Sequence, residues 1–394
     1  MPVELAYAIL TPYSLYKSRT GGILARLIAR TGLDLVGARM FAPSRELVGE
    51  YASMVISARD PQDRQIQNLI RDYVQTHFTP NPKTGRRQRV MMLLFRGEKA
   101  VSKIRNVVGK FSIDRTGGET IRDTYGDLVF DAQNQVQYFE PAVLAAPDAA
   151  EAEQKLALWA RYSDADGGVL EDVIAYPADQ KGQRTLVLIK PENFRFPTGR
   201  PGNVIDFFSR AGLYIVGIKV HRMSVAEACE FYGPVREALR VNLKETVALR
   251  ARSVLEKEFG FKIPAEETRQ LGELLCPVFG DYQFENIVKF MSGRAPSECD
   301  EADKTAPGTE KCIALIYEGV DAIRKIRDVL GPTDPSKAPP GSIRREFGQT
   351  IMVNAAHASD SEENARREIG IVYSGGNDIK TTVGESCQKQ PLER

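Results

Sequence analysis

A histidine near residue 357 and its polar neighbours form the part of this sequence best suited to covalent chemistry. His357 lies in the run NAAHASDS, residues 354–361, and is one of three histidines in the chain. A lone histidine is usually structural, but Glu368 follows 11 residues later. Its carboxylate could hold one imidazole nitrogen and leave the other to attack an electrophile. The spacing Ser359-x-x-Glu362 matches a capping box, so a helix should begin here, and its N-terminus would favour an anion beside the histidine.

Positively charged residues upstream of this segment could neutralise a phosphate. Lys190 ends the apolar run TLVLIK, while Arg327 and Arg344 lie in Lys-Ile-Arg and Ser-Ile-Arg. An arginine presents a planar, permanently charged fork to phosphate oxygens, and a lysine supplies a compact charge. Alone, these residues would indicate a charged surface. Beside an Asn-x-x-His-x-Ser run they predict phosphoryl transfer, which depends mainly on positioning and charge neutralisation.

These residues occur together in a known pattern. The second half of the chain, residues 184–369 without two insertions, resembles the nucleoside diphosphate kinases. The resemblance implies that His357 accepts the phosphate, that Ser359 and Glu368 orient it, and that Tyr232 lies beside it. It also implies nucleotide contacts from Lys190, Arg327, Thr333, Arg344 and Asn354.

The resemblance further implies a position for the nucleotide base between an aromatic and an apolar side chain. In strict register the aromatic position holds Gln283, but Tyr282 or Phe284 could serve, and Ile351 could cover the other face. The implied reaction is ping-pong: ATP or another nucleoside triphosphate phosphorylates His357, and a nucleoside diphosphate then takes the phosphate. Mg²⁺ would bridge phosphate oxygens, and we expect no metal ligands from protein side chains.

The sequence also contains an internal repeat, which bears on its domain organisation. The segments AYAILTP, residues 6–12, and TLVLIKP, residues 185–191, open the two copies, and GLDLVGA, residues 32–38, matches GLYIVGI, residues 212–218. In each copy an Ile-Arg pair is followed 17 residues later by a second arginine: Arg105 and Arg122, then Arg327 and Arg344. A tandem arrangement follows.

Each copy is predicted to be an α+β domain of the ferredoxin-like, split βαβ kind. In the first copy the apolar patterns predict strands at residues 6–10, 34–40, 90–95 and 128–130, and helices at 22–31, 44–57 and 100–108. We expect domains at 1–165 and 184–372, a helical insertion at about 233–281, an exposed loop at 294–311 and a weakly structured tail at 373–394.

The first copy retains only part of the polar set: Tyr51, Arg105 and Arg122. Thr11 stands where the second copy has its lysine. Counting on from the second arginine places Gln135 at the histidine position, whereas aligning the segment Ala-Ala-Pro-Asp with Ala-Ser-Asp-Ser places Leu144 there. Neither is a nucleophile, and His77 lies in a Pro- and Thr-rich segment where we expect a solvated loop. This copy should not catalyse, and we expect the two copies to pack on each other as a pair.

The composition limits the class of protein. Fifty-three basic and 52 acidic residues give a net charge of +1, which does not favour nucleic-acid or membrane binding. Five cysteines without a CxxC spacing argue against a disulfide framework or structural zinc, and for a reducing compartment. The N-terminus does not resemble a signal peptide and no apolar run is long enough for a membrane span. We expect a cytoplasmic protein.

Three functions stay open from the sequence. The first is a nucleoside diphosphate kinase that binds nucleoside tri- and diphosphates and forms a homo-oligomer. The alternative is a nucleotide-binding scaffold or assembly protein on the same fold, which the incomplete first copy and the insertions favour. A histidine phosphorelay protein is the third.

Overall fold

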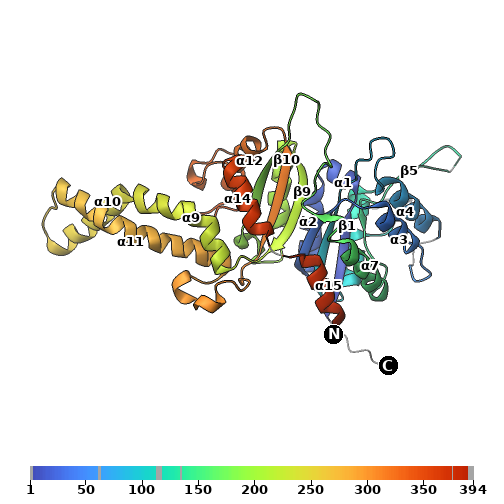
Figure 1. Ribbon diagram of the computed structural model, residues 1–394, viewed down its shortest axis with the longest axis horizontal. Coiled ribbons are helices and arrows are strands. Elements are labelled where there is room, and N and C mark those ends of the chain that lie inside the picture. Colours follow the sequence, from blue (N-terminus) through green and yellow to red (C-terminus); the bar gives the residue numbers. More distant parts are fainter. Residues whose placement is uncertain (1–2, 61–63, 112–117, 134, 375, 389–394) are drawn as a thin grey trace. The chain divides into compact units, whose positions relative to one another are not determined.

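The computed structural model describes most of the 394 residues in two compact units (Figure 1). The described residues are 3–60, 64–111, 118–133, 135–374 and 376–388. The first unit comprises Met1–Val220, Ile313–Ile369 and Gly375–Arg394, and the second comprises His221–Cys312 and Gly370–Ser374. The first unit contains both large sheets, so it carries both copies of the repeat.

The sheet of the first copy is antiparallel around a central buried strand. Its strands are β1 (Val3–Leu10), β2 (Asp34–Phe41), β3 (Val90–Glu98), β6 (Val143–Leu144) and β7 (Gly167–Gly168). They lie in the order β6-β1-β3-β2-β7, with β1 and β2 both antiparallel to β3. The first six residues of β3 are buried, because both faces of this strand are covered. The predicted strands at 6–10, 34–40 and 90–95 are confirmed.

The sheet of the second copy has a corresponding strand order. Its strands are β8 (Gln183–Ile189), β9 (Tyr214–His221), β10 (Cys312–Gly319) and β11 (Ala356–Ala358). They lie in the order β11-β8-β10-β9, which matches the order β6-β1-β3-β2 of the first sheet, where β7 adds a further strand beside β2. All eight residues of β10 are buried. The sequence repeat therefore corresponds to a repeated strand order.

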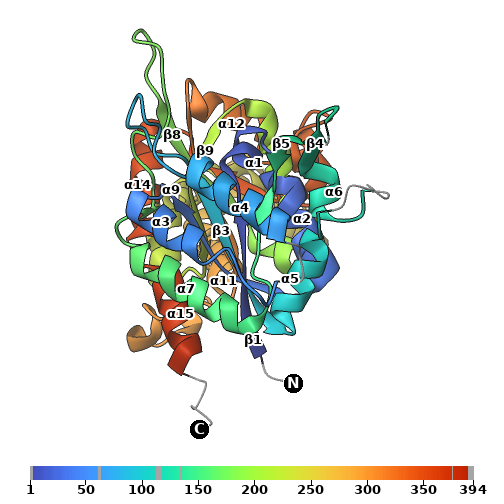
Figure 2. The ribbon, with the colours of Figure 1, turned by 90° about the vertical axis from the view of Figure 1, so that its right-hand side faces the viewer.

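Helices cover these sheets, and in Figure 2 α3, α4 and α7 lie over one face of the first sheet. The first copy contains α1 (Pro12–Tyr16), α2 (Thr20–Thr31), α3 (Arg45–Ser53), α4 (Arg64–His77), α5 (Ala100–Val108), α6 (Ile121–Tyr125) and α7 (Ala149–Tyr162). A two-stranded ribbon, β4 (Asp127–Phe130) and β5 (Val136–Glu140), accompanies them. The second copy contributes η1 (Pro191–Phe194), α8 (Arg200–Phe208), α12 (Ala322–Leu330), α13 (Ile343–Phe347) and α14 (Glu362–Tyr373). The predicted helices at 22–31, 44–57 and 100–108 are present, the second of them shorter than expected.

Besides the short helices α1 and α6, three longer helices differ from our predictions. Helices α4 and α7 were not predicted, and α15 (Asp378–Gln388) lies in the segment that we expected to be a weakly structured tail. His77 is the last residue of α4 and not part of a loop, although its side chain is exposed as expected. Residues 375 and 389–394 of the predicted tail lie outside the described residues.

The second unit is largely helical. It contains α9 (Val225–Asn242), α10 (Lys244–Phe259) and α11 (Ala265–Ser292), followed by the short 3-10 helices η3 (Pro296–Glu298) and η4 (Glu301–Asp303). Ser224 and Glu227 form a capping box that begins α9. Helix α11 packs along both α9 and α10. At Gly280 of α11 an added Cβ would lie 2.8 Å from the backbone nitrogen of Arg240 in α9, so α9 and α11 approach closely there. None of the helices that the structure describes is long and apolar enough to cross a membrane.

Within the first unit the two copies contact each other through α2 and α8. Their backbones meet at glycines, because a Cβ at Gly202 would lie 2.4 Å from the backbone nitrogen of Ala25 and the carbonyl oxygen of Gly21. A Cβ at Gly21 would lie 2.5 Å from the backbone nitrogen of Asp206. The expected packing of one copy on the other is therefore present, and it depends on the missing side chains of two glycines.

This contact predicts the effect of a single added methyl group. Gly202→Ala should lower the free energy of unfolding by about 1–3 kcal/mol, because the new atom overlaps backbone that cannot change rotamer. The matched control is Gly49→Ala in α3, where no atom lies within 4 Å of the added Cβ; it should raise that free energy by about 0.5–1 kcal/mol. Denaturant unfolding of the two variants checks this. Equal stabilities would contradict the α2–α8 packing.

Candidate active site

Strand β11 positions His357 at the edge of the second sheet. His357 lies opposite Leu188 of β8. The backbone N–H of Lys190 donates to the carbonyl of Ala355 at 3.0 Å, and that of Ser359 donates to the carbonyl of Leu186 at 3.1 Å. Ala355 has a φ of +72°, a left-handed conformation that costs a non-glycine residue free energy. The chain therefore turns sharply just before the histidine, and three residues of strand hold it.

A buried carboxylate orients the imidazole of His357. Nε2 of His357 lies 2.9 Å from Oε2 of Glu368, and the hydroxyl of Ser359 donates to the same oxygen at 2.6 Å. Glu368 is 4% exposed and Ser359 is fully buried. Because an ionised carboxylate only accepts hydrogen bonds, the proton lies on Nε2 and the lone pair on Nδ1. The pair predicted from sequence spacing is therefore in contact.

The start of α14 differs from our prediction. The hydroxyl of Ser361 accepts from the backbone N–H of Asn364 at 3.1 Å and caps the helix. The capping box predicted at Ser359 and Glu362 is wrong, because the hydroxyl of Ser359 is committed to Glu368. The cap lies two residues later, and this frees Ser359 for the histidine's partner.

Lys190 and Asn354 form a second polar contact within this unit. The ammonium of Lys190 donates to Oδ1 of Asn354 at 3.0 Å and to the carbonyl of Met352. The amide of Asn354 donates to the carbonyls of Thr333 at 3.1 Å and Ile351 at 2.8 Å. Burial lowers the pKa of Lys190 to about 8, with an opposing effect from the negative charge of Glu192. The side chain of Lys190 is only 7% exposed. The loop that leads to the histidine holds it through these two hydrogen bonds.

The two predicted phosphate arginines differ in exposure. Arg344 is half-buried and donates to the carbonyls of Gly331 at 3.0 Å and Ala356 at 3.3 Å. It also lies 3.5 Å from the hydroxyl of Thr333. Arg327 and Thr333 are exposed. Arg344 is thus fixed by two backbone carbonyls, one of them in the histidine strand, while Arg327 presents its charge to solvent.

Four predicted residues remain: one is exposed on the first unit, and three belong to the second unit. Ile351 is 63% exposed. Tyr232, on α9, and Tyr282 and Phe284, on α11, belong to the second unit. There Tyr282 is 60% exposed, whereas Phe284 is 5% exposed and its ring lies 5.3 Å from the guanidinium of Arg236. Their roles toward the histidine and the base stay predictions.

Two residues that the sequence analysis missed hold the turn before His357. Oε1 of Glu192 accepts from the backbone N–H of Ala355 at 2.8 Å. The amide of Asn193 donates to the carbonyls of Ala355 at 2.8 Å and Lys190 at 2.9 Å. Both residues are buried. The sequence signal was the polar pair that directly follows Lys190-Pro191, at the end of the apolar run TLVLI.

The first copy repeats this backbone without the histidine. The N–H of Thr11 donates to the carbonyl of Ala142 at 3.1 Å, and Ala142 has a φ of +57°, as in the second copy. Leu144 then pairs with Ile9, one residue after the pairing of Val143 with Leu10. Leu144 therefore occupies the position of His357. Gln135 does not; that assignment is wrong because the β4–β5 ribbon changes the spacing.

The partner of the histidine is replaced too. Asp148 caps α7 as Ser361 caps α14, and Lys155 follows Asp148 by seven residues, as Glu368 follows Ser361. A buried cation thus stands where the second copy has a buried carboxylate. Thr11, in the place of Lys190, donates instead to Glu140 at 2.8 Å.

Comparisons with known proteins give matches over about half of the chain or less. A family model described as nucleoside diphosphate kinase matches residues 304–377. The nucleoside diphosphate kinase of Wolinella succinogenes is 51% identical over 194 residues, 49% of this chain and 96% of its own length. That of Staphylothermus marinus is 30% identical over 191 residues, 48% of this chain and 92% of its own. The crystal structure of the Aquifex aeolicus nucleoside diphosphate kinase matches at 28% identity and a TM-score of 0.32, over 50% of this chain and 97% of that one.

The lowered pKa of Lys190 predicts a pH dependence of stability. The folded chain loses this proton near pH 8, whereas an ordinary lysine keeps it to about 10.5. Between these values the unfolded chain binds more protons, so rising pH stabilises the folded state. From about pH 7 to 10.5, the free energy of unfolding of wild type relative to Lys190→Met should rise by on the order of 3 kcal/mol. Urea unfolding at several pH values tests this, and a difference that is independent of pH would contradict it.

Proposed function

The chain belongs to the nucleoside diphosphate kinase family, and from this we propose that its second half transfers the terminal phosphate of a nucleoside triphosphate to a nucleoside diphosphate through His357. The observation that carries the proposal is the bond of 2.9 Å between Nε2 of His357 and the buried carboxylate of Glu368. This bond sets the tautomer that a nucleophilic imidazole needs. Lys190 and Arg344, in the same unit, supply the positive charge that a phosphate requires.

The proposed first step forms one bond and breaks one. The lone pair on Nδ1 of His357 attacks the terminal phosphorus, and an N–P bond forms. The bond from this phosphorus to the bridging oxygen breaks, and its electron pair leaves with the nucleoside diphosphate. The proton on Nε2 stays there, and Glu368 stabilises the positive charge that develops on the ring. An oxygen of the acceptor diphosphate then attacks the phosphorus and forms an O–P bond, while the N–P bond breaks and its electron pair returns to Nδ1 as the lone pair of the neutral imidazole.

Phosphate binding in this proposal rests on charge. The exposed guanidinium of Arg327 and the hydroxyl of Thr333 are accessible to a nucleotide from solvent, while Arg344 and Lys190 are held in place by backbone carbonyls. Asn354 would contact the sugar, Tyr232 would lie beside the histidine, and Tyr282 or Phe284 and Ile351 would enclose the base. Tyr282 is the better base candidate of the two aromatics because it is exposed.

A magnesium ion fits this site as part of the nucleotide. Within the described residues, no group of three or more His, Cys, Asp or Glu side chains is arranged to hold a metal ion. The cationic residues instead suit phosphate oxygens, which would carry Mg²⁺ themselves. When bound, Mg²⁺ would neutralise charge on the transferred phosphate.

The first copy is proposed to be a degenerate domain of the same kind, with Leu144 and Lys155 in the positions of His357 and Glu368. The alternative, a nucleotide-binding scaffold with little turnover, shares the fold and the charged residues. The ordered contact between His357 and Glu368 favours the enzyme, because a scaffold has no need of an oriented nucleophile. Homo-oligomer formation and a cytoplasmic location stay predictions.

Replacing the nucleophile tests this proposal directly. His357→Ala should lower phosphotransfer by roughly 10⁴-fold or more, as for removal of other catalytic nucleophiles. It should also abolish acid-labile labelling by radioactive ATP. The control is His77→Asn, at the exposed end of α4, which should label and turn over like wild type. Wild-type exchange by the His357 variant would refute the assignment, and labelling without transfer to diphosphates would indicate a phosphorelay protein.

Arg344 and Arg122 form a matched pair for locating the working site. Losing a charge-assisted hydrogen bond costs about 1.5–3 kcal/mol, so Arg344→Ala should lower kcat/KM roughly tenfold to a hundredfold. Arg122→Ala should leave kcat/KM unchanged while lowering the melting temperature, because Arg122 is buried and bonded to two carbonyls. Equal losses of activity in the two variants would contradict the assignment of the working site to the second copy.

A further inference from the structure

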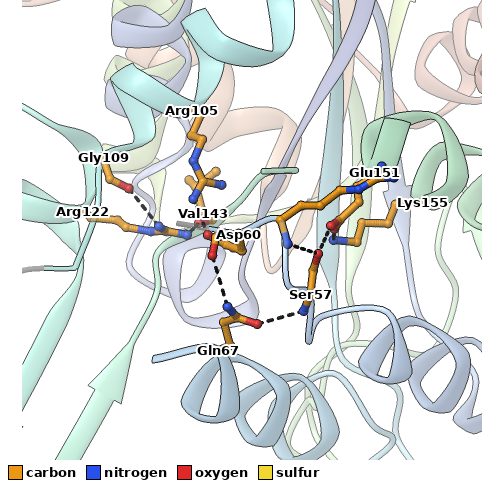
Figure 3. A network of polar contacts seen from close by, with 10 residues as sticks. Ser57, Asp60, Gln67, Arg105, Gly109, Arg122, Val143, Glu151 and Lys155 are labelled. Carbon is orange, nitrogen blue, oxygen red and sulfur yellow. Dashed lines mark hydrogen bonds and ion pairs between the residues drawn. The ribbon is translucent and has the colours of Figure 1, made fainter. Parts of the chain in front are cut away.

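The first copy keeps the framework of a phosphate site. Nη1 of Arg122 donates to the carbonyl of Gly109 at 2.8 Å, and Nη2 donates to that of Val143 at 3.2 Å (Figure 3). Arg344 makes the same two contacts in the second copy, at 3.0 and 3.3 Å, with Gly331 and Ala356. The guanidinium therefore has the same attachment in both copies.

The two copies differ in the surroundings of their first arginine, Arg105 or Arg327. Arg327 is exposed, but its counterpart Arg105 is ion-paired with the carboxylate of Asp60. In that pair the side chain of Arg105 is 15% exposed and that of Asp60 is 10% exposed. The charge of Asp60 also acts on Arg122, whose pKa burial lowers to about 10 while Asp60 raises it. The carboxylate is thus paired with Arg105, and its charge also acts on Arg122.

Arg122 still has a donor to offer. Its Nε is buried and has no hydrogen-bond partner among the described residues. The side chain is 7% exposed, and its guanidinium lies 4.5 Å from the ring of Phe111. An arginine in this state bonds backbone carbonyls through two of its nitrogens and keeps the N–H of Nε, together with its charge, for an anion.

The segment that carries Asp60, residues 57–60, is held in place from both ends. The amide of Gln67 donates to the carbonyl of Asp60 at 3.4 Å, and its oxygen accepts from the backbone N–H of Ser57 at 2.8 Å. The hydroxyl of Ser57 donates to Glu151, which also binds the ammonium of Lys155 at 2.6 Å (Figure 3). Lys155 is the residue in the position of Glu368. The lysine that replaces the carboxylate therefore binds Glu151, and Glu151 holds the segment that carries Asp60.

We propose that the first copy retains a phosphate-binding site built on Arg105 and Arg122, and that the carboxylate of Asp60 occupies it in place of a phosphate. A carboxylate presents two oxygens to guanidinium groups much as a phosphate does. Because it is tethered, it competes at a high effective concentration against any nucleotide in solution. The copy is thus closed to nucleotides by its own side chain, and loss of that carboxylate opens the site to the diphosphate of ADP.

The test removes the second copy's site first, so that it does not depend on turnover at His357. In a Lys190→Ala, Arg344→Ala background, binding of radiolabelled ADP is measured by equilibrium dialysis. Asp60→Ala in this background should bind ADP at least tenfold more tightly than the background itself, at one site per chain. Adding Arg122→Ala should remove that binding. Asp60→Asn, which keeps the shape of the side chain without its charge, is the second variant if Asp60→Ala fails to fold.

The outcomes separate cleanly. A gain of ADP binding on either Asp60 substitution, lost again with Arg122→Ala, supports the proposal. Binding by Asp60→Ala or Asp60→Asn no tighter than the background overturns it. It is also overturned if the background already binds ADP and Arg122→Ala alone abolishes that binding, because the site would then be open in the native chain.

Discussion

The pairing of a very short strand, β6 or β11, with the first strand of its copy is the constraint on which both copies depend. In each copy an alanine with a positive φ turns the chain immediately before this strand: Ala142 in the first and Ala355 in the second. Such a conformation costs an alanine roughly 1–2 kcal/mol, so it needs support from its surroundings. In each copy a buried carboxylate accepts from the alanine's N–H, from Glu140 at 2.9 Å and from Glu192 at 2.8 Å.

In the two copies, the carboxylate that stabilises this turn comes from opposite sides of it in the sequence. Glu192 follows the first strand of its copy, and Lys190 is then available to bond Asn354. Glu140 precedes the turn, and it is bound by Thr11 and by the hydroxyl of Tyr73 at 2.5 Å. Exchange of lysine for threonine is therefore one part of a repacked site, and a carboxylate from the other side completes it. The fold tolerates the exchange because the strand pairing itself uses only backbone groups.

Much of this arrangement could be predicted from the sequence, and the misses have identifiable physical causes. The pairing of His357 with Glu368 followed from spacing, because the strand and the first turns of a helix fix that separation. The position of Leu144 could not be reached by counting, because the β4–β5 ribbon alters the distance from Arg122; only strand register decided it. Helix α7 carried a clear signal in its alanine- and leucine-rich sequence. Asp60 had none, since the contact with Arg105 joins residues 45 apart in the sequence.

If the first copy is a degenerate domain, as proposed, its charges give a physical reason why its two arginines remain. Arg122 is buried and donates to two backbone carbonyls, so it contributes to the fold as well as to any anion site. Once no phosphate binds, its charge and that of Arg105 lie in a poorly solvated position without a counter-ion, which costs several kcal/mol. Either the arginines must be lost, with the loop contacts they make, or an internal anion must replace the phosphate. In the ion pairs of Asp60 with Arg105 and of Glu151 with Lys155, the carboxylates are internal anions of this kind, each beside a cation. In the proposed degenerate copy, the contact of α2 with α8 is preserved in this way.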